Sequence, residues 1–105
     1  MLKAELGSVS IGTLKTDDLL EAFADELEYQ IFRNEDYFSL PENFDQRDRL
    51  TLLVDLAREI PPVSEEAVLL TYELEEALNE FAPDGAYFGA HPGDAADFGF
   101  WLSED

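Results

Sequence analysis

The sequence has 105 residues, of which 46% are hydrophobic and 12% aromatic. This length suits one domain, spanning residues 1–105, and the apolar content excludes an acidic disordered tail. The net charge of −19, from 25 acidic and 6 basic residues, is the outlying property. Solubility needs only about 2–8 charges in a small domain. The charge argues against direct binding to nucleic acid or to an anionic membrane, and for a basic protein surface as the partner.

The cysteine count and the hydropathy pattern bear on the location of the protein. The chain has no cysteine, which excludes disulfides, a thiol nucleophile and a zinc–thiolate site. The N-terminal residues lack the features of a secretory signal, and no stretch approaches the roughly 18 apolar residues of a membrane span. We therefore expect a cytoplasmic location.

The first element in chain order is a candidate edge strand within residues 2–14. Leu2, Ala4 and Leu6 alternate with polar residues, and Gly7 and Gly12 interrupt the pattern.

An amphipathic helix is predicted over residues 17–33. Thr16 is the expected N-cap, because Asp17 and Asp18 follow it in the first turn. The apolar residues recur at helical spacing and are Leu19, Leu20, Phe23, Ala24, Leu27 and Ile31. Residues 34–43 are predicted to be a loop that folds back onto the core through Tyr37, Phe38, Leu40 and the following Phe44.

Two further helices are predicted, one over residues 45–60 and one that begins after Ser64 as its N-cap. Pro61 and Pro62 end the former, and residues 83–85 (PDG) end the latter. The expected buried face of the second helix is Leu50, Leu53, Val54, Ala57 and Ile60. That of the third is Val68, Leu70, Leu74, Ala77, Leu78 and Phe81.

Residues 86–91 and 97–102 are aromatic and alternating, which predicts a β-hairpin with the five-residue connection PGDAA. Gly89 and Gly99 lie inside its arms, where a neighbouring ring or helix can approach closely. A lone hairpin is marginal in water, so it must pack on the helices or gain a third strand, for which the N-terminal segment is the candidate. The predicted fold is therefore α+β, with three amphipathic helices packed on a C-terminal hairpin.

Acidic stripes on two helices are the candidate binding surface. The first helix carries Asp17, Asp18, Glu21, Asp25 and Glu28, and the third carries Glu66, Glu73, Glu76 and Glu80. An ordinary solvated face mixes signs, but the first helix has no Lys or Arg before Arg33 and the third has none. Duplex DNA carries one charge per about 1.7 Å, so one stripe is too sparse to imitate it. Two adjacent stripes with Glu35, Asp36 and Glu42 come within about a factor of two of that density.

The basic residues of the second helix have local candidate partners. Arg47, Arg49 and Arg58 are expected to pair with acids of the same helix, namely Asp48, Asp55 and Glu59.

His91, the only histidine, is the one residue that suggests catalysis or metal binding. With Asp94 and Asp97 it could form a proton relay or a metal site, although no second histidine or thiolate completes a ligand set. His and Asp also serve plain turn chemistry, which is the interpretation we favour. No nucleophile elbow, phosphate-binding glycine loop or calcium loop is present. We expect no cofactor and no enzymatic activity.

The aromatic residues of the hairpin are either core or binding surface. A strand presents two faces, so Tyr87 or Trp101 could be exposed. Such a side chain beside acids would anchor an arginine-rich partner.

The C-terminal segment FAPDGAYFGAHPGDAADFGFWLSED covers about a quarter of the chain. It resembles the end of small bacterial and phage proteins that finish in an FGAHxGDxxDFGFW pattern, a resemblance that implies no activity. In size and charge the chain is also similar to the DNA-mimicking anti-CRISPR and anti-restriction proteins of phages and mobile elements. This resemblance implies an inhibitor that acts in a bacterial host cell and blocks the nucleic-acid-binding surface of a defence complex. The alternatives are an acidic accessory module, such as an immunity protein, antitoxin or assembly factor, and a small hydrolase that uses His91.

Overall fold

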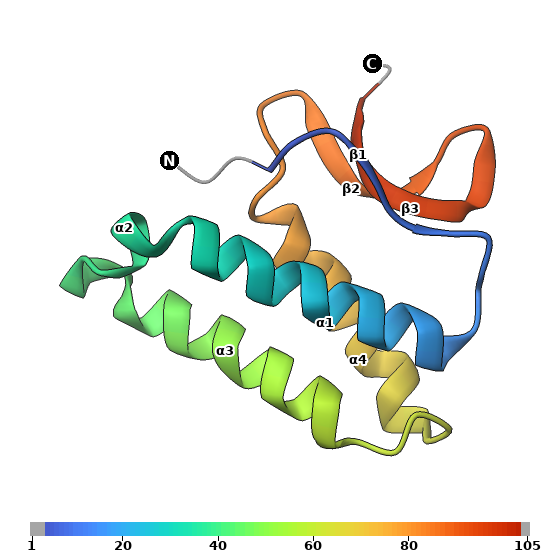
Figure 1. Cartoon of the computed structure of the whole chain (residues 1–105), viewed down its shortest axis with the longest axis horizontal. Helices are drawn as coiled ribbons and strands as arrows, with labels where there is room; N and C mark the ends of the chain where they lie inside the picture. Colours follow the sequence, from blue (N-terminus) through green and yellow to red (C-terminus); the bar gives the residue numbers. More distant parts are fainter. Residues whose placement is uncertain (1–3, 104–105) are drawn as a thin grey trace.

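A computed structural model describes residues 4–103 and has an α+β fold (Figure 1). In chain order the elements are β1 (Gly7–Ile11), α1 (Thr16–Arg33), α2 (Glu35–Phe38), a 3-10 helix (Pro41–Asn43), α3 (Phe44–Glu59), α4 (Glu65–Asn79), β2 (Ala86–His91) and β3 (Asp94–Leu102). The three long helices, the C-terminal hairpin and the N-terminal third strand were all predicted, and the structure confirms them.

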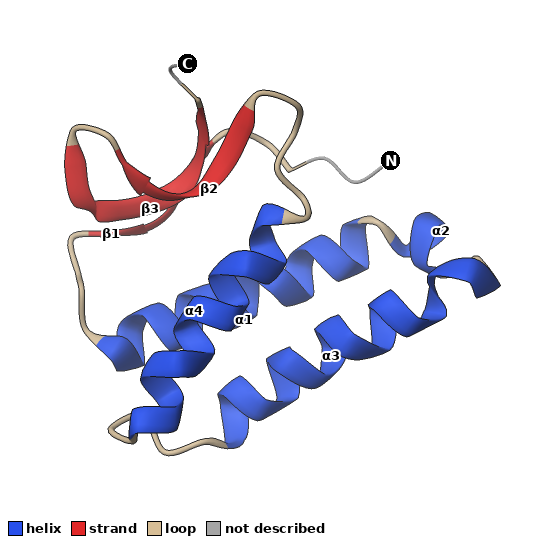
Figure 2. Cartoon of the chain, turned by 180° about the vertical axis from the view of Figure 1, so that it is seen from behind, coloured by secondary structure: helices blue, strands red, loops and turns tan. Residues whose placement is uncertain are grey.

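The strands form one antiparallel sheet in the order β1-β3-β2, which packs on α1 and α4. Helix α3 lies beside α1, and α4 lies behind this pair in Figure 1 and in front of it in the reverse view of Figure 2. The largest fully buried side chains come from the sheet, from all three helices and from the segment after α4; they are Phe23, Phe81, Phe88, Phe100, Leu27, Leu50, Leu74, Leu78 and Gln30. Burial of the apolar side chains among these is the main favourable term in folding.

The hairpin is tighter than predicted. Only Pro92 and Gly93 connect the two strands, because Asp94 already belongs to β3 and pairs with His91. The five-residue connection was therefore wrong. The extra residues are accommodated by an irregular register between Ala90, which pairs with Phe98, and His91.

Strand β1 begins at Gly7 and ends before Gly12, so it lies between the two glycines and does not include Leu6 of the predicted alternation. Leu2, the first residue of the predicted alternation, lies outside the described residues, and Ala4 precedes the strand as a buried residue. Gly99 on β3 explains how closely β1 approaches, since a Cβ atom there would lie 2.1 Å from the carbonyl oxygen of Gly7. The neighbour at Gly99 is thus a strand backbone, whereas at Gly89 it is the expected aromatic ring, that of Tyr87.

The two predicted helix caps have different outcomes. Ser64 caps α4 as expected, because its hydroxyl accepts a hydrogen bond from the Ala67 N–H at 3.2 Å. Thr16 is not the cap of α1: it is the first helical residue, and the capping position belongs to Lys15. Instead, the Thr13 hydroxyl donates to the Asp18 carboxylate at 2.7 Å.

The segment between α1 and α3 is helical and not a loop, since it contains α2 and the 3-10 helix. Phe38 and, in part, Tyr37 pack against the core, but Leu40 and Phe44 are exposed. On α4, Val68 is also exposed and not buried as predicted, while Ala67 and Thr71 are buried. The periodicity was therefore correct, but the apolar face of α4 is rotated toward Ala67.

Asn79, the last residue of α4, covers the free edge of β2. Its amide nitrogen donates to the Phe88 carbonyl at 3.0 Å, and its amide oxygen accepts from the Phe88 N–H at 2.8 Å. These two bonds satisfy backbone groups that an edge strand would otherwise leave open to another strand. Across the part of the chain that the structure describes, no helix combines the length and the apolar character needed to cross a membrane.

Candidate partner-binding surface

The acids of α1 lie along one exposed side of the helix. Asp17, Asp18, Glu21, Asp25 and Glu28 are all exposed, whereas Phe23 and Leu27 enter the core. This side borders α3, because Asp17, Glu21 and Asp25 line one hollow with the end of α3 and Glu28 lines another with its middle. Four of these acids therefore belong to a surface that α1 and α3 form together, whereas Asp18 lines a hollow with Val9 of β1.

Arg58 of α3 bridges this surface. Its guanidinium donates to the Glu28 carboxylate at 2.7 and 3.0 Å and to Asp25 at 3.0 Å. The hydrogen bond from Arg58 holds the pKa of Glu28 below its usual value, and Glu28 followed by Asp25 raises the pKa of Arg58. The expected pairing of Arg58 with Asp55 or Glu59 was wrong, because α1 packs close enough to supply better-placed acceptors.

Arg49 likewise pairs outside its own helix, with the residue that follows α4. It donates to the Glu80 carboxylate at 2.8 and 3.1 Å, and this contact raises the pKa of Arg49. Glu80 is therefore held at the junction of α3 and α4. Only Arg47 has its predicted partner, Asp48, at 3.2 Å. Three of the nine predicted binding acids, Asp25, Glu28 and Glu80, are thus already paired with arginine.

The acids of α4 do not extend the α1 stripe. Glu66, Glu73 and Glu76 are exposed, whereas Leu74 on the inner face of α4 is buried. Helix α4 lies on the other side of the molecule from the surface where α1 and α3 run side by side (Figures 1 and 2). The α1 acids share hollows with α3 and β1, not with α4. The two stripes, expected to be adjacent, therefore belong to different surfaces.

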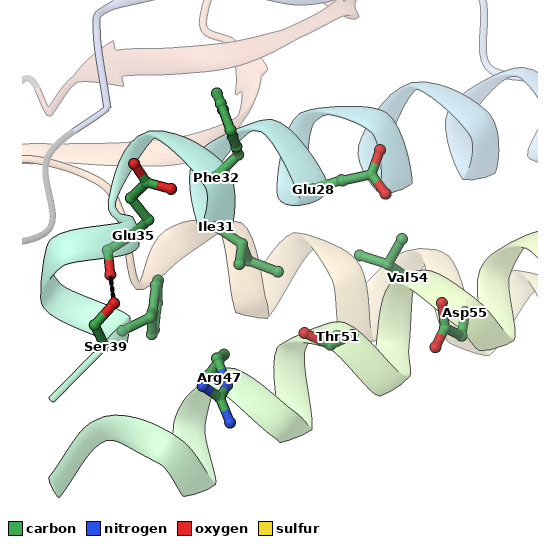
Figure 3. A pocket seen from close by; sticks show the side chains of 10 residues that line it. Glu28, Ile31, Phe32, Glu35, Ser39, Arg47, Thr51, Val54 and Asp55 are labelled. Carbon is green, nitrogen blue, oxygen red and sulfur yellow. Dashed lines mark hydrogen bonds between the residues drawn. The ribbon is translucent and has the colours of Figure 1, made fainter. Parts of the chain in front are cut away.

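The α1–α3 surface has a larger hollow of about 750 Å³ at the C-terminal end of α3 and a groove of about 370 Å³ nearer α2. Figure 3 shows Ile31 of α1 and Val54 of α3 pointing into it, and Phe38 of α2 completes an apolar floor. Val54 and Phe38 are 3% and 2% exposed. Phe32 lies on the rim, with its ring projecting from α1 away from α3 and 69% exposed. We call this feature the α1–α3 groove.

Carboxylates stand at both ends of the α1–α3 groove (Figure 3). Glu35 lies at one end, and Glu28 and Asp55 lie at the other. Within residues 4–103, neither the Glu35 nor the Asp55 carboxylate has a salt-bridge partner. Arg47 also lines the groove, but it pairs with Asp48 and stacks 4.3 Å above the Phe44 ring centroid. The groove therefore combines an apolar floor with negative ends.

Tyr87 and Trp101 are not the exposed anchors that the sequence allowed. They are cross-strand partners in β2 and β3, and both are half-buried. The Tyr87 hydroxyl donates to the Ala90 carbonyl at 2.8 Å, and the Trp101 indole N–H donates to the Gly89 carbonyl at 3.0 Å. Because both polar groups are bonded within the hairpin, these side chains stabilise the sheet.

His91 takes part in the structure of the turn. Its Nδ1 accepts a hydrogen bond from the Gly93 N–H at 2.9 Å, and its ring packs edge-on against Trp101 with 4.7 Å between centroids. Asp94 accepts from the Ala96 N–H at 3.0 Å. Both side chains therefore make the turn contacts that the plain interpretation expects. In the described range, no three His, Cys, Asp or Glu side chains are grouped as a metal site requires.

Sequence reasoning missed the groove itself. Ile31 was assigned to the core stripe, and Phe32 and Thr51 were not assigned a role. The one available signal was Phe32, an aromatic residue that falls on the polar side of α1 when the helical period is followed from Phe23. The comparisons with protein-family models, with curated proteins and with solved structures returned no match to this chain.

Proposed function

We propose that this chain is a non-enzymatic inhibitor from a phage or mobile element, which occupies the nucleic-acid-binding surface of a host defence complex. The acids of α1 that are not paired with Arg58, together with Glu35, Asp55 and Glu59, take the place of phosphates and pair with Lys and Arg of the target. The inhibitor competes by steric exclusion and charge, and no bond is made or broken.

The observation that supports this proposal is the charge along the surface between α1 and α3. The two hollows there are lined by seven carboxylates and two guanidinium groups. A concave surface of one sign raises the local potential and accelerates association with a partner of opposite sign. The proposed mimic surface is therefore formed by acids of α1 and α3, and it does not include the acids of α4.

A competition gel-shift with candidate CRISPR and restriction complexes tests the proposal. The double variant Asp17→Asn/Glu21→Gln removes two exposed α1 charges, and Glu73→Gln/Glu76→Gln removes two from α4 as a matched control. We expect the α1 variant to need more protein for half-inhibition, by roughly threefold for each carboxylate removed. The α4 variant should inhibit almost as well as the natural chain.

Association should also slow as salt rises, because steering depends on unscreened charge. Unchanged DNA binding by every complex tested would contradict the proposal. Equal losses in the α1 and α4 variants would contradict the assignment of the surface.

The apolar floor of the α1–α3 groove favours a second candidate, an accessory module that binds one specific basic protein without imitating DNA. A phosphate mimic has no use for an apolar groove. Thr51→Trp, which places a large ring in the groove, separates the two. It should abolish binding by an accessory module and change DNA competition by less than about threefold in a mimic.

A further inference from the structure

The α1–α3 groove has the shape and chemistry of a helix-binding site. We propose that it receives an amphipathic basic helix of the partner protein, with the apolar side chains of that helix on the groove floor and its Lys or Arg residues at the acidic ends. This inference deepens the second candidate, a module that binds one basic protein, and rests on the leading proposal only in taking the partner to be basic.

The apolar part of the argument is the groove floor. Ile31, Phe38 and Val54 come from three different helices and converge on one concavity. Its volume of about 370 Å³ is at the lower end of the roughly 300–1,000 Å³ typical of ligand sites. That space suits a few large side chains entering from outside, which is how an amphipathic helix anchors in a groove.

The charges of the groove identify the partner as basic. The carboxylates of Glu35 and Asp55 are at opposite ends and are unpaired within the described residues, so each offers an acceptor to an incoming Lys or Arg. Arg47 does not reverse this preference for a basic partner, because it forms a salt bridge with Asp48. An apolar centre between two negative ends complements a helix with an apolar centre and basic flanks.

The two walls of the groove indicate that the occupant is a helix. Helices α1 and α3 run side by side (Figure 1), and a third helix can seat its side chains in the furrow between two such helices. A second copy of this chain is a poor occupant, since each copy carries a net charge of −19 and the like charges repel.

The test uses the full chain labelled for NMR and a synthetic helical peptide of about 18 residues, long enough to form a helix alone. The peptide contains Lys, Leu and Ala, with its leucines at positions i, i+3, i+4 and i+7. In a control peptide, Ser replaces each Leu. We expect the Leu peptide to shift amide signals in α2, α3 and the C-terminal half of α1, and to bind at least about tenfold more tightly than the Ser peptide.

Two matched variants of the chain complete the experiment. Thr51→Trp blocks the groove and should weaken Leu-peptide binding by at least about tenfold, whereas Leu52→Trp, at the next exposed position of α3 and outside the groove, should change it by less than about twofold. Glu35→Gln/Asp55→Asn removes the acidic ends without adding bulk. This variant should weaken Leu-peptide binding, and it keeps the test valid if Thr51→Trp disturbs the folding of α3. Unchanged affinity in the Glu35→Gln/Asp55→Asn variant would overturn the assignment of the basic flanks.

Three further results would overturn the inference: no binding of the Leu peptide, equal affinity for the two peptides, or shifts that spread over α4. Each would leave the charge-based function intact, because that function is decided separately by competition with DNA.

Discussion

The fold makes the carboxyl group of Glu75 harder to ionise. It lies on α4 beside Gly89 of β2, and burial, followed by the charge of Glu76, raises its pKa. Because the pKa is higher in the folded than in the unfolded state, ionisation of Glu75 lowers the free energy of unfolding at neutral pH. That loss is relieved as pH falls through the raised pKa.

We therefore expect Glu75→Gln to stabilise the protein at pH 7, by less than about 1 kcal/mol because part of the side chain remains in water. Urea denaturation at several pH values measures this effect. The gain should shrink as the solution is acidified toward the pKa of Glu75. A gain independent of pH would show that ionisation of Glu75 is not its cause.

At the scale of elements, the attachment of β1 depends on the absence of a side chain at Gly99. A Cβ atom there would lie 2.1 Å from the Gly7 carbonyl oxygen and 2.9 Å from the Ser8 Cα, so β1 would have to move away from β3. Backbone atoms of a paired strand cannot yield as a flexible side chain can. Strand β1 can therefore pair closely with β3 because Gly99 has no side chain.

We expect Gly99→Ala to destabilise the protein by about 3 kcal/mol or to release β1 from the sheet. Gly93→Ala is the matched control, since a Cβ atom there meets only the His91 ring, at 3.4 Å. Hydrogen exchange at the amides of β1 checks the result. Normal protection of β1 in Gly99→Ala would contradict the close approach on which the prediction depends.

At the scale of the whole molecule, charge repulsion opposes folding. The chain carries a net charge of −19, and the described residues contain ion pairs for only three of its arginines, Arg47, Arg49 and Arg58. Added salt screens the remaining repulsion, since the screening length falls from about 30 Å at 0.01 M to about 8 Å at 0.15 M ionic strength.

We expect the melting temperature to rise as sodium chloride is added over this range, by several degrees. Differential scanning calorimetry measures it, with Asp17→Asn/Glu21→Gln as the control that should show a smaller rise. A fall in melting temperature would mean that the arginine bridges, including Arg58 with Asp25 and Glu28, contribute more than repulsion removes.

Much of the fold could be predicted because it depends on local pattern. The helical spacing of Leu19, Phe23 and Leu27 indicates α1, and Ser64 marks the start of α4 by a hydrogen bond only three residues away. The alternating aromatic residues of the hairpin likewise indicate two strands. Each of these signals needs only neighbours in sequence, so the sequence alone determined the three long helices, the hairpin and the α+β class, but not α2 or the 3-10 helix.

The tertiary structure alone decided which charges meet and which surface is hollow. Arg58 has acids nearby on its own helix, but its partners Glu28 and Asp25 are 30 and 33 residues away. Likewise, the acids of α1 and of α4 form similar stripes in the sequence, but the two stripes belong to different surfaces. The physical reason is that a groove, or an ion pair between two helices, requires two elements at a fixed distance and rotation. Those quantities follow from the packing of the whole core and not from the period of any one helix.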